Sequence, residues 1–185
     1  PENMDEIVPR ISAFANTQNK VQIADFSAND PYHRRIEELS RTVWAPAQGG
    51  LLPQNWFYER ARGQYADMLA RETTTLRRKK FKETHPLFTK TDLAKYENTW
   101  DQLPFYVSEG AQKNFRRFTV RLSQAKAKLP DETYYQHLIS KAILFKQTEN
   151  LVSKQQYGGY RANIVTYTLA FLSFKTAQRI DLDKI

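Results

Sequence analysis

The chain has 185 residues and a formal net charge of +8, from 28 lysine and arginine residues against 20 aspartate and glutamate residues. Its composition, 41% hydrophobic and 13% aromatic, excludes an intrinsically disordered chain, because this much apolar surface can form a core. The absence of cysteine excludes disulfides and thiolate metal sites and fits the cytoplasm. The positive charge favours an acidic partner, and nucleic acid is the commonest one.

The sequence predicts neither a membrane span nor a signal peptide. The longest strongly apolar stretch, Tyr167 to Phe174, is far too short to cross a bilayer, so we expect no membrane partner. The chain starts with Pro1 rather than Met and ends abruptly. We therefore interpret it as a piece of a larger protein, whose remaining domains are expected partners, and we predict no particular oligomeric state.

The N-terminal part predicts two helices separated by a polar turn and a short extended segment. Helical spacing covers residues 3–15, and alternating apolar and polar residues favour a short strand near residues 20–26. The second helix is expected to start at Pro31, to be capped by Asn29 and to end near Val43.

A loop over residues 45–54, with two prolines and a glycine pair, is the clearest break in the chain. Everything after it is predicted to be helical, beginning with a helix over residues 56–71. Side-chain oxygens that accept hydrogen bonds from the first turn mark later helix starts. The expected caps are Thr73 or Thr74, Thr91 and Asp131.

Two further patterns complete the expected fold. Apolar residues recur at helical spacing over residues 107–122, which predicts one amphipathic helix. The last helix, over residues 160–178, is apolar on nearly every side, which is typical of the buried centre of a bundle. We therefore predict an all-α fold, a bundle of about 6–8 helices over residues 27–185. Residues 1–26 are expected to be the tail of a preceding domain, or an N-terminal helix with a polar turn.

Five short motifs follow one another along almost the whole chain. They are NTQNK from Asn16, WFYERARG from Trp56, FTKTDLAKY from Phe88, GAQKNF from Gly110 and GGYRANI from Gly158. Together they resemble the AIPR family, the abortive infection phage resistance proteins of bacteria. The resemblance implies a bacterial, cytoplasmic protein with a role in defence against phage. It implies no catalytic mechanism.

The amide-rich turn near the N-terminus is a first candidate site, since each amide brings donors and an acceptor that need partners. A helix that ends in such a turn, before a Val-x-Ile-x-Asp-Phe segment, also resembles the end of a ParB-like core. That resemblance implies half of a nucleotide or nucleic-acid site, completed by residues upstream of this chain. The candidate residues are Asn16, Gln18, Asn19 and Asp25.

No complete catalytic constellation can be recognised in the sequence. His33, His85 and His137 are far apart and lack neighbours at metal-ligand spacing. No acidic residue has a lysine two positions later, as the common restriction-type nuclease core requires. We predict no metal and no cofactor, and the residues leave open whether the protein is an enzyme.

Two cationic clusters form the second candidate site. Lysine and arginine neutralise phosphates without reading sequence, so such clusters favour salt-dependent binding of nucleic acid. The candidates are Arg77, Arg78, Lys79, Lys80 and Lys82 in one run, and Lys113, Arg116, Arg117 and Arg121 along a later helix.

Three functions follow from these observations. The first is a helical module of a phage-defence protein that contacts nucleic acid or positions an effector domain. The second is part of a composite nuclease or nucleotide-processing site, completed by a region upstream. The third is a structural scaffold for self-association.

Overall fold

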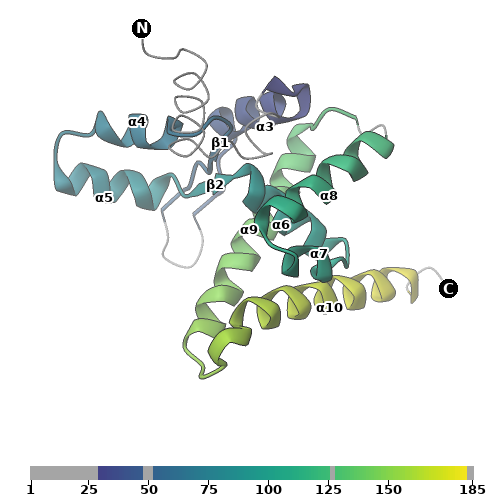
Figure 1. Cartoon of the computed structure of the whole chain (residues 1–185). Coiled ribbons are helices and arrows are strands. Elements are labelled where there is room, and N and C mark those ends of the chain that lie inside the picture. Colours follow the sequence, from purple (N-terminus) through teal and green to yellow (C-terminus); the bar gives the residue numbers. More distant parts are fainter. Residues whose placement is uncertain (1–28, 48–51, 126–127, 183–185) are drawn as a thin grey trace, which may run out of the picture.

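The computed structural model describes residues 29–47, 52–125 and 128–182. These residues form eight helices and one small parallel sheet of two strands, so the mostly helical prediction is confirmed (Figure 1). The helix expected over residues 3–15 and the strand expected near residues 20–26 lie outside the described residues. The domain division after residue 26 stays a prediction. None of the described helices combines the length and hydrophobicity needed to cross a lipid bilayer.

Helix α3 (Pro31–Thr42) starts where the proline predicted, but its cap is Asp30 rather than Asn29. The Asp30 carboxylate accepts a hydrogen bond from the Tyr32 backbone N–H at 2.8 Å, which satisfies a donor of the first turn. One face of α3 is buried, and Ile36 on that face is completely enclosed.

The predicted helix over residues 56–71 is wrong in its first part. Strand β1 (Phe57–Glu59) pairs in parallel with β2 (Leu87–Thr89), and Tyr58 aligns with Phe88. Both of these aromatic side chains are fully buried, and aromatic residues favour strands because they pack well on a sheet surface. Our restriction of any β-structure to residues 20–26 is therefore corrected by this sheet.

Two helices connect the strands and stand away from the body as an arm (Figure 1). They are α4 (Gln64–Ala70) and α5 (Thr75–Thr84), and neither contains a buried residue. As predicted, Thr74 caps α5, and its hydroxyl accepts a hydrogen bond from the Arg77 backbone N–H at 3.2 Å. We call α4, α5 and the turn between them the arm.

Helix α6 (Lys90–Trp100) directly follows β2. Thr89, rather than Thr91, caps it, because the Thr89 hydroxyl accepts from the Asp92 backbone while the Asp92 carboxylate accepts from the Thr89 backbone. Asp92, the last residue of this capping box, lies in the first turn of α6, where its negative charge interacts favourably with the positive end of the helix dipole.

The single helix expected over residues 107–122 is in fact two helices, α7 (Pro104–Ser108) and α8 (Ala111–Gln124). Gly110 separates them with a φ of +96°, a conformation that side chains with a Cβ rarely adopt. The apolar spacing continues across the break, but the backbone changes direction there.

Helix α9 (Glu132–Ser153) starts at the predicted cap Asp131 and packs against α3 and α6. A short 3₁₀ helix, η2 (Gly158–Tyr160), leads into α10 (Arg161–Leu182). The prediction that the last helix is the buried centre is wrong. Helix α10 lies along the edge of the body and packs one face on α6, α7 and α9 (Figure 1). Its other face leaves four large apolar side chains exposed: Tyr167, Phe171, Leu172 and Phe174.

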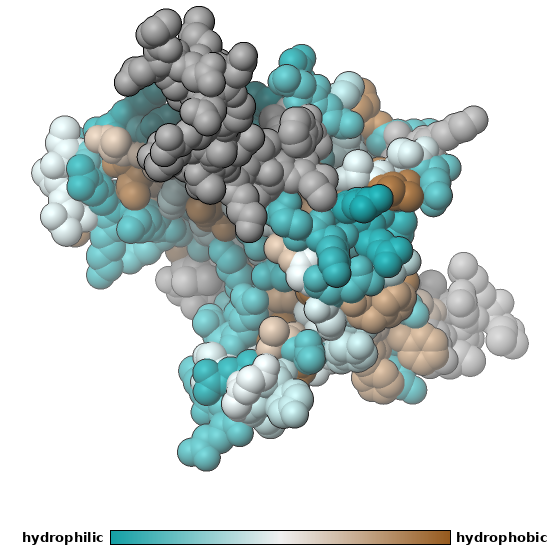
Figure 2. Space-filling view, in the orientation of Figure 1, coloured by the Kyte–Doolittle hydropathy of each residue, from teal (hydrophilic) through white to brown (hydrophobic). Residues whose placement is uncertain are grey.

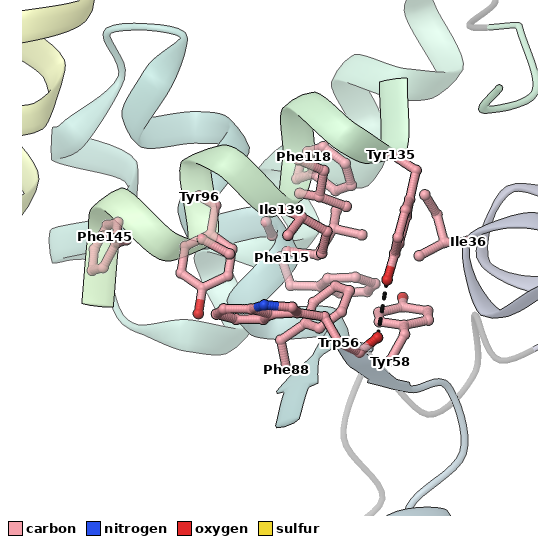
Figure 3. Close-up of a cluster of buried hydrophobic side chains, with 14 of the residues drawn as sticks. Ile36, Trp56, Tyr58, Phe88, Tyr96, Phe115, Phe118, Tyr135, Ile139 and Phe145 are labelled. Atoms are coloured by element: carbon pink, nitrogen blue, oxygen red, sulfur yellow. Dashed lines mark hydrogen bonds between the residues drawn. The ribbon is translucent and has the colours of Figure 1, made fainter. Parts of the chain in front are cut away.

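The core is rich in aromatic side chains that come from α3, β1, β2, α6, α8 and α9, several of which Figure 3 shows. Trp56 lies beneath α9, and its backbone carbonyl accepts a 2.9 Å hydrogen bond from the buried Tyr135 hydroxyl. Neighbouring rings are tilted against one another, and the planes of Tyr58 and Phe88, for example, form an angle of 40°. Aromatic rings prefer such tilted or offset arrangements, because the negative face of one ring attracts the positive edge of the other. This core holds the sheet against α9 and so fixes where the arm leaves the body.

Candidate nucleic-acid interface

Helix α5 carries the densest cationic surface of the described residues. The five candidates Arg77, Arg78, Lys79, Lys80 and Lys82 are all exposed. Glu83 is the one acidic residue within the same helix. Ten residues therefore present five positive charges and one negative charge to solvent, on an arm that protrudes from the body (Figure 1).

These charges are scarcely neutralised from within the protein. Among the described residues, no carboxylate forms an ion pair with any of the five α5 cations. The Arg78 guanidinium donates to the Glu72 backbone carbonyl at 2.9 Å, which orients this side chain without cancelling its charge. An exposed helix with unpaired cations attracts phosphate groups from every direction of approach.

Aromatic contacts hold α5 in place beside α4. Phe81 stacks on His85 with ring centroids 4.4 Å apart, and it also contacts Tyr65 at 5.6 Å. The Tyr65 hydroxyl donates to the His85 carbonyl at 3.0 Å. Phe81 thus anchors the helix to the arm, while the lysines and arginines face solvent.

The second predicted cluster is partly neutralised by acidic residues. Arg117 forms an ion pair with Glu109 at 3.2 Å, and Arg121 forms one with Asp101 at 2.6 Å. The Arg121 guanidinium also donates to the Asn98 amide oxygen at 2.5 Å.

Lys113 and Arg116 of the same cluster are exposed on α8. In Figure 1, α8 lies on the other side of the molecule from the arm, so the structure does not join the two clusters into one surface. Of the two, the α5 cluster is the one in which no cation forms an ion pair with a carboxylate of the described residues.

A groove that the sequence did not predict lies beside α9. It has a volume of about 940 Å³ and runs between α9 and the segments over residues 43–46 and 52–56. Trp44 stands at its rim with 53% of its surface exposed, and its ring meets His85 edge-on at 5.8 Å. The one sequence signal was a large aromatic residue next to a proline- and glycine-rich loop, where no helix or strand explains it.

Lys146 contributes the one charged side chain among the described residues that line this groove. Its ammonium donates to the Leu87 carbonyl at 3.3 Å and lies 4.6 Å from the centroid of the Trp56 ring. Burial lowers the pKa of this ammonium below its ordinary value, since a charged group loses hydration there. The groove is therefore mildly positive and otherwise uncharged.

The amide-rich candidate site cannot be placed, because Asn16, Gln18, Asn19 and Asp25 lie outside the described residues. The composite active site therefore stays a prediction. Within the described part of the chain, no group of three or more histidine, aspartate or glutamate side chains is arranged to hold a metal ion.

Comparison with known proteins places the chain in one family. No curated protein and no solved structure matches it. The family model with the description "AIPR protein" matches residues 1–185, the whole chain. The protein therefore belongs to the AIPR family, which is linked to abortive-infection phage resistance.

Proposed function

We propose that this chain is a nucleic-acid-contacting module of a phage-defence protein and that α5 makes the principal contact. The observation that carries the proposal is the set of five exposed cations on α5, none of which forms an ion pair with a carboxylate of the described residues. The net charge of +8 adds a long-range attraction to polyanions.

The expected mode of binding is electrostatic and weakly specific. The five cations are distributed around the helix axis, because successive residues are rotated by about 100°. A nucleic acid that approaches from one side thus meets two or three of them at once. Each neutralised phosphate of a duplex contributes about −0.9 to the slope of log affinity against log salt concentration. A slope between about −2 and −3 is therefore expected.

The test is a charge reversal on α5 with a control of equal charge. Lys79→Glu/Lys80→Glu changes the net charge as much as Lys154→Glu/Lys175→Glu, whose residues are exposed but belong to neither cluster. Binding to a labelled duplex and to a labelled single strand is measured by fluorescence anisotropy at several salt concentrations. The α5 variant should lose at least about tenfold in affinity and flatten the salt slope, whereas the control should lose far less.

Two results would contradict the proposal. Equal losses in both double variants would mean that only the overall charge attracts nucleic acid, without a site on α5. No binding by the wild-type protein at low salt would exclude nucleic-acid contact by this module. In the full-length protein, Lys79→Glu/Lys80→Glu should also lower protection against phage in a plaque assay, while Lys154→Glu/Lys175→Glu should preserve it.

A further inference from the structure

We propose that the groove beside α9 binds an unpaired nucleobase of the same nucleic acid that contacts α5. This inference rests on the proposed function. It specifies the ligand further, because the nucleic acid must be a strand with at least one accessible, unstacked base. Two features carry it, the position of the groove at the end of α5 and the chemistry of its rim and walls.

The groove begins where the cationic helix ends. His85 caps the C-terminus of α5 and packs edge-on against Trp44 at the rim, and the next residue, Pro86, lines the groove itself. From the other side, the Gln54 side-chain amide donates to the Glu83 carbonyl of α5 at 3.1 Å. A strand whose phosphates lie along α5 therefore passes the mouth of the groove.

Trp44 is placed as a stacking platform. Its indole is half exposed, although so large an apolar ring is normally buried. Its neighbour Ala45 exchanges two backbone hydrogen bonds with Gln54, at 2.7 and 3.0 Å, and Asn55 donates to the Val43 carbonyl at 3.0 Å. The backbone on both sides of Trp44 is thus fixed, so an incoming base meets a ring that is already held at the surface. Stacking on an aromatic side chain tolerates any base, because every base has a π-face.

The wall formed by α9 offers hydrogen bonds without negative charge. Its polar side chains recur at helical spacing, as Gln136, Ser140, Gln147 and Asn150, and no carboxylate is among the described lining residues. Side-chain amides both donate and accept, as the edges of bases require. Between them, Ile143 supplies apolar surface for the faces of a ring. A polar lining without negative charge fits a base, while phosphates remain outside with the arm.

Trp56 contributes to the floor of the groove. It is 3% exposed, and its indole N–H is enclosed, with no hydrogen-bond partner among the described residues (Figure 3). Trp56 therefore offers the groove apolar surface rather than a donor for a ligand. Lys146, beside the same ring, gives the floor a positive charge that favours electron-rich base edges over cations.

The dimensions agree with this occupant. The volume of about 940 Å³ lies at the upper end of the range for small-ligand sites. The lining residues of α9, from Tyr135 to Asn150, span about 22 Å of helix. This length accommodates one inserted base and its neighbours on the strand. An apolar peptide is the main alternative occupant, and the cationic arm at the mouth favours the nucleic acid.

The experiment compares single-stranded and duplex DNA of the same sequence, about 12 nucleotides long, which is the scale of single-strand sites. Trp44→Ala should weaken single-strand binding about 5- to 100-fold and leave duplex binding unchanged, because only an unpaired base can stack there. Trp44→Phe keeps an aromatic ring and should retain the single-strand preference. Tyr167→Ala removes an exposed aromatic ring from α10 and should change neither affinity.

A second variant tests the groove from its opposite wall. Ser140→Trp, at an exposed position of α9 that lines the groove, introduces a large side chain there and should lower single-strand affinity as Trp44→Ala does. A strand with abasic sites should bind the wild-type protein as weakly as the intact strand binds Trp44→Ala.

The outcomes separate this inference from the proposed function. If Lys79→Glu/Lys80→Glu abolishes binding but Trp44→Ala and Ser140→Trp bind both DNA forms as the wild type does, the groove is not a base site and α5 alone is the interface. Equal binding of abasic and intact strands would overturn the inference in the same way. Displacement of the groove-dependent signal by an apolar peptide, with no single-strand preference, would assign the groove to a peptide instead.

Discussion

The Nδ1 atom of His33 and the hydroxyl oxygen of Tyr58 lie 2.6 Å apart in the interior, where α3 packs against β1. His33 is 2% exposed, and the ring of Tyr58 stacks against its imidazole at 6.2 Å between centroids. Burial lowers the pKa of His33 to about 4, because the imidazolium form would lose its hydration, and the nearby Asp30 carboxylate offsets only part of this loss. The imidazole is thus neutral at pH 7 and serves the core as a hydrogen-bonding aromatic ring.

This burial predicts a loss of stability in mild acid. The unfolded chain protonates His33 near its ordinary pKa of 6.5, whereas the folded protein protonates it only near pH 4. As the pH falls from about 6.5 to about 4, the unfolded state is favoured by about 3 kcal/mol from this one group. Urea unfolding at a series of pH values measures it. His33→Gln should flatten the profile in this window, and His137→Gln, at an exposed position of α9, should not.

Glu97 of α6 and Lys141 of α9 form the most deeply buried ion pair of the described residues, with 8% and 17% of their side chains exposed. The Lys141 ammonium donates to both carboxylate oxygens of Glu97, at 3.0 and 2.9 Å. Burial raises the pKa of Glu97, and the ammonium opposes this shift. Lys141→Met should therefore lower the unfolding free energy by about 3 to 5 kcal/mol at neutral pH, because it leaves a buried carboxylate without its counter-ion.

The loss in Lys141→Met should shrink as the pH falls, since protonation of Glu97 removes the uncompensated charge. Glu97→Leu/Lys141→Leu is the matched control, and it should recover most of the lost stability because neither charge remains. A double variant as unstable as Lys141→Met would mean that side-chain packing, rather than charge pairing, determines the effect.

Much of the fold could be predicted because the signals are local. Thr74 and Asp131 cap helices as expected, since a cap depends on a side chain and the backbone two or three residues later. The strand at Phe57 was missed because a short apolar run fits a helix and a strand equally well. Its pairing with β2 depends on Leu87, a residue distant in sequence.

The candidate site also has parts that the sequence reveals and parts that only the fold reveals. The run of lysine and arginine residues on α5 is visible in the sequence, and these side chains are exposed because α5 has no apolar face that could be buried. The pairing of Arg121 with Asp101 required the fold, because the two residues are 20 positions apart and belong to different elements. The groove is entirely a tertiary feature, since its rim at Trp44 and its wall at Ser140 meet only when α9 packs against the segments over residues 43–46 and 52–56.

Arg121 is therefore predicted to stabilise the fold rather than to bind nucleic acid. Its guanidinium links Asp101 to the buried Asn98, whose amide in turn donates to the Asn114 side-chain oxygen at 2.7 Å. Arg121→Ala leaves the Asn98 oxygen without this charged donor and should lower the unfolding free energy by about 1 to 3 kcal/mol. Binding measured under conditions where the variant is folded should match that of the wild type. A loss of affinity as large as that of Lys79→Glu/Lys80→Glu, without a loss of stability, would contradict this assignment.

The two faces of α10 provide the sharpest comparison within one element. Leu169 is 3% exposed and packs in the core, while Leu172, three residues later, is 43% exposed. Leu169→Ala should lower the unfolding free energy by about 2 to 5 kcal/mol through lost burial and a residual cavity. Leu172→Ala removes the same atoms from a largely exposed site and should cost less than about 0.5 kcal/mol. Chemical denaturation of both variants measures the two losses in unfolding free energy. If the two substitutions cost the same, then α10 is buried on all sides, as its composition had indicated, and its outer face is covered in solution.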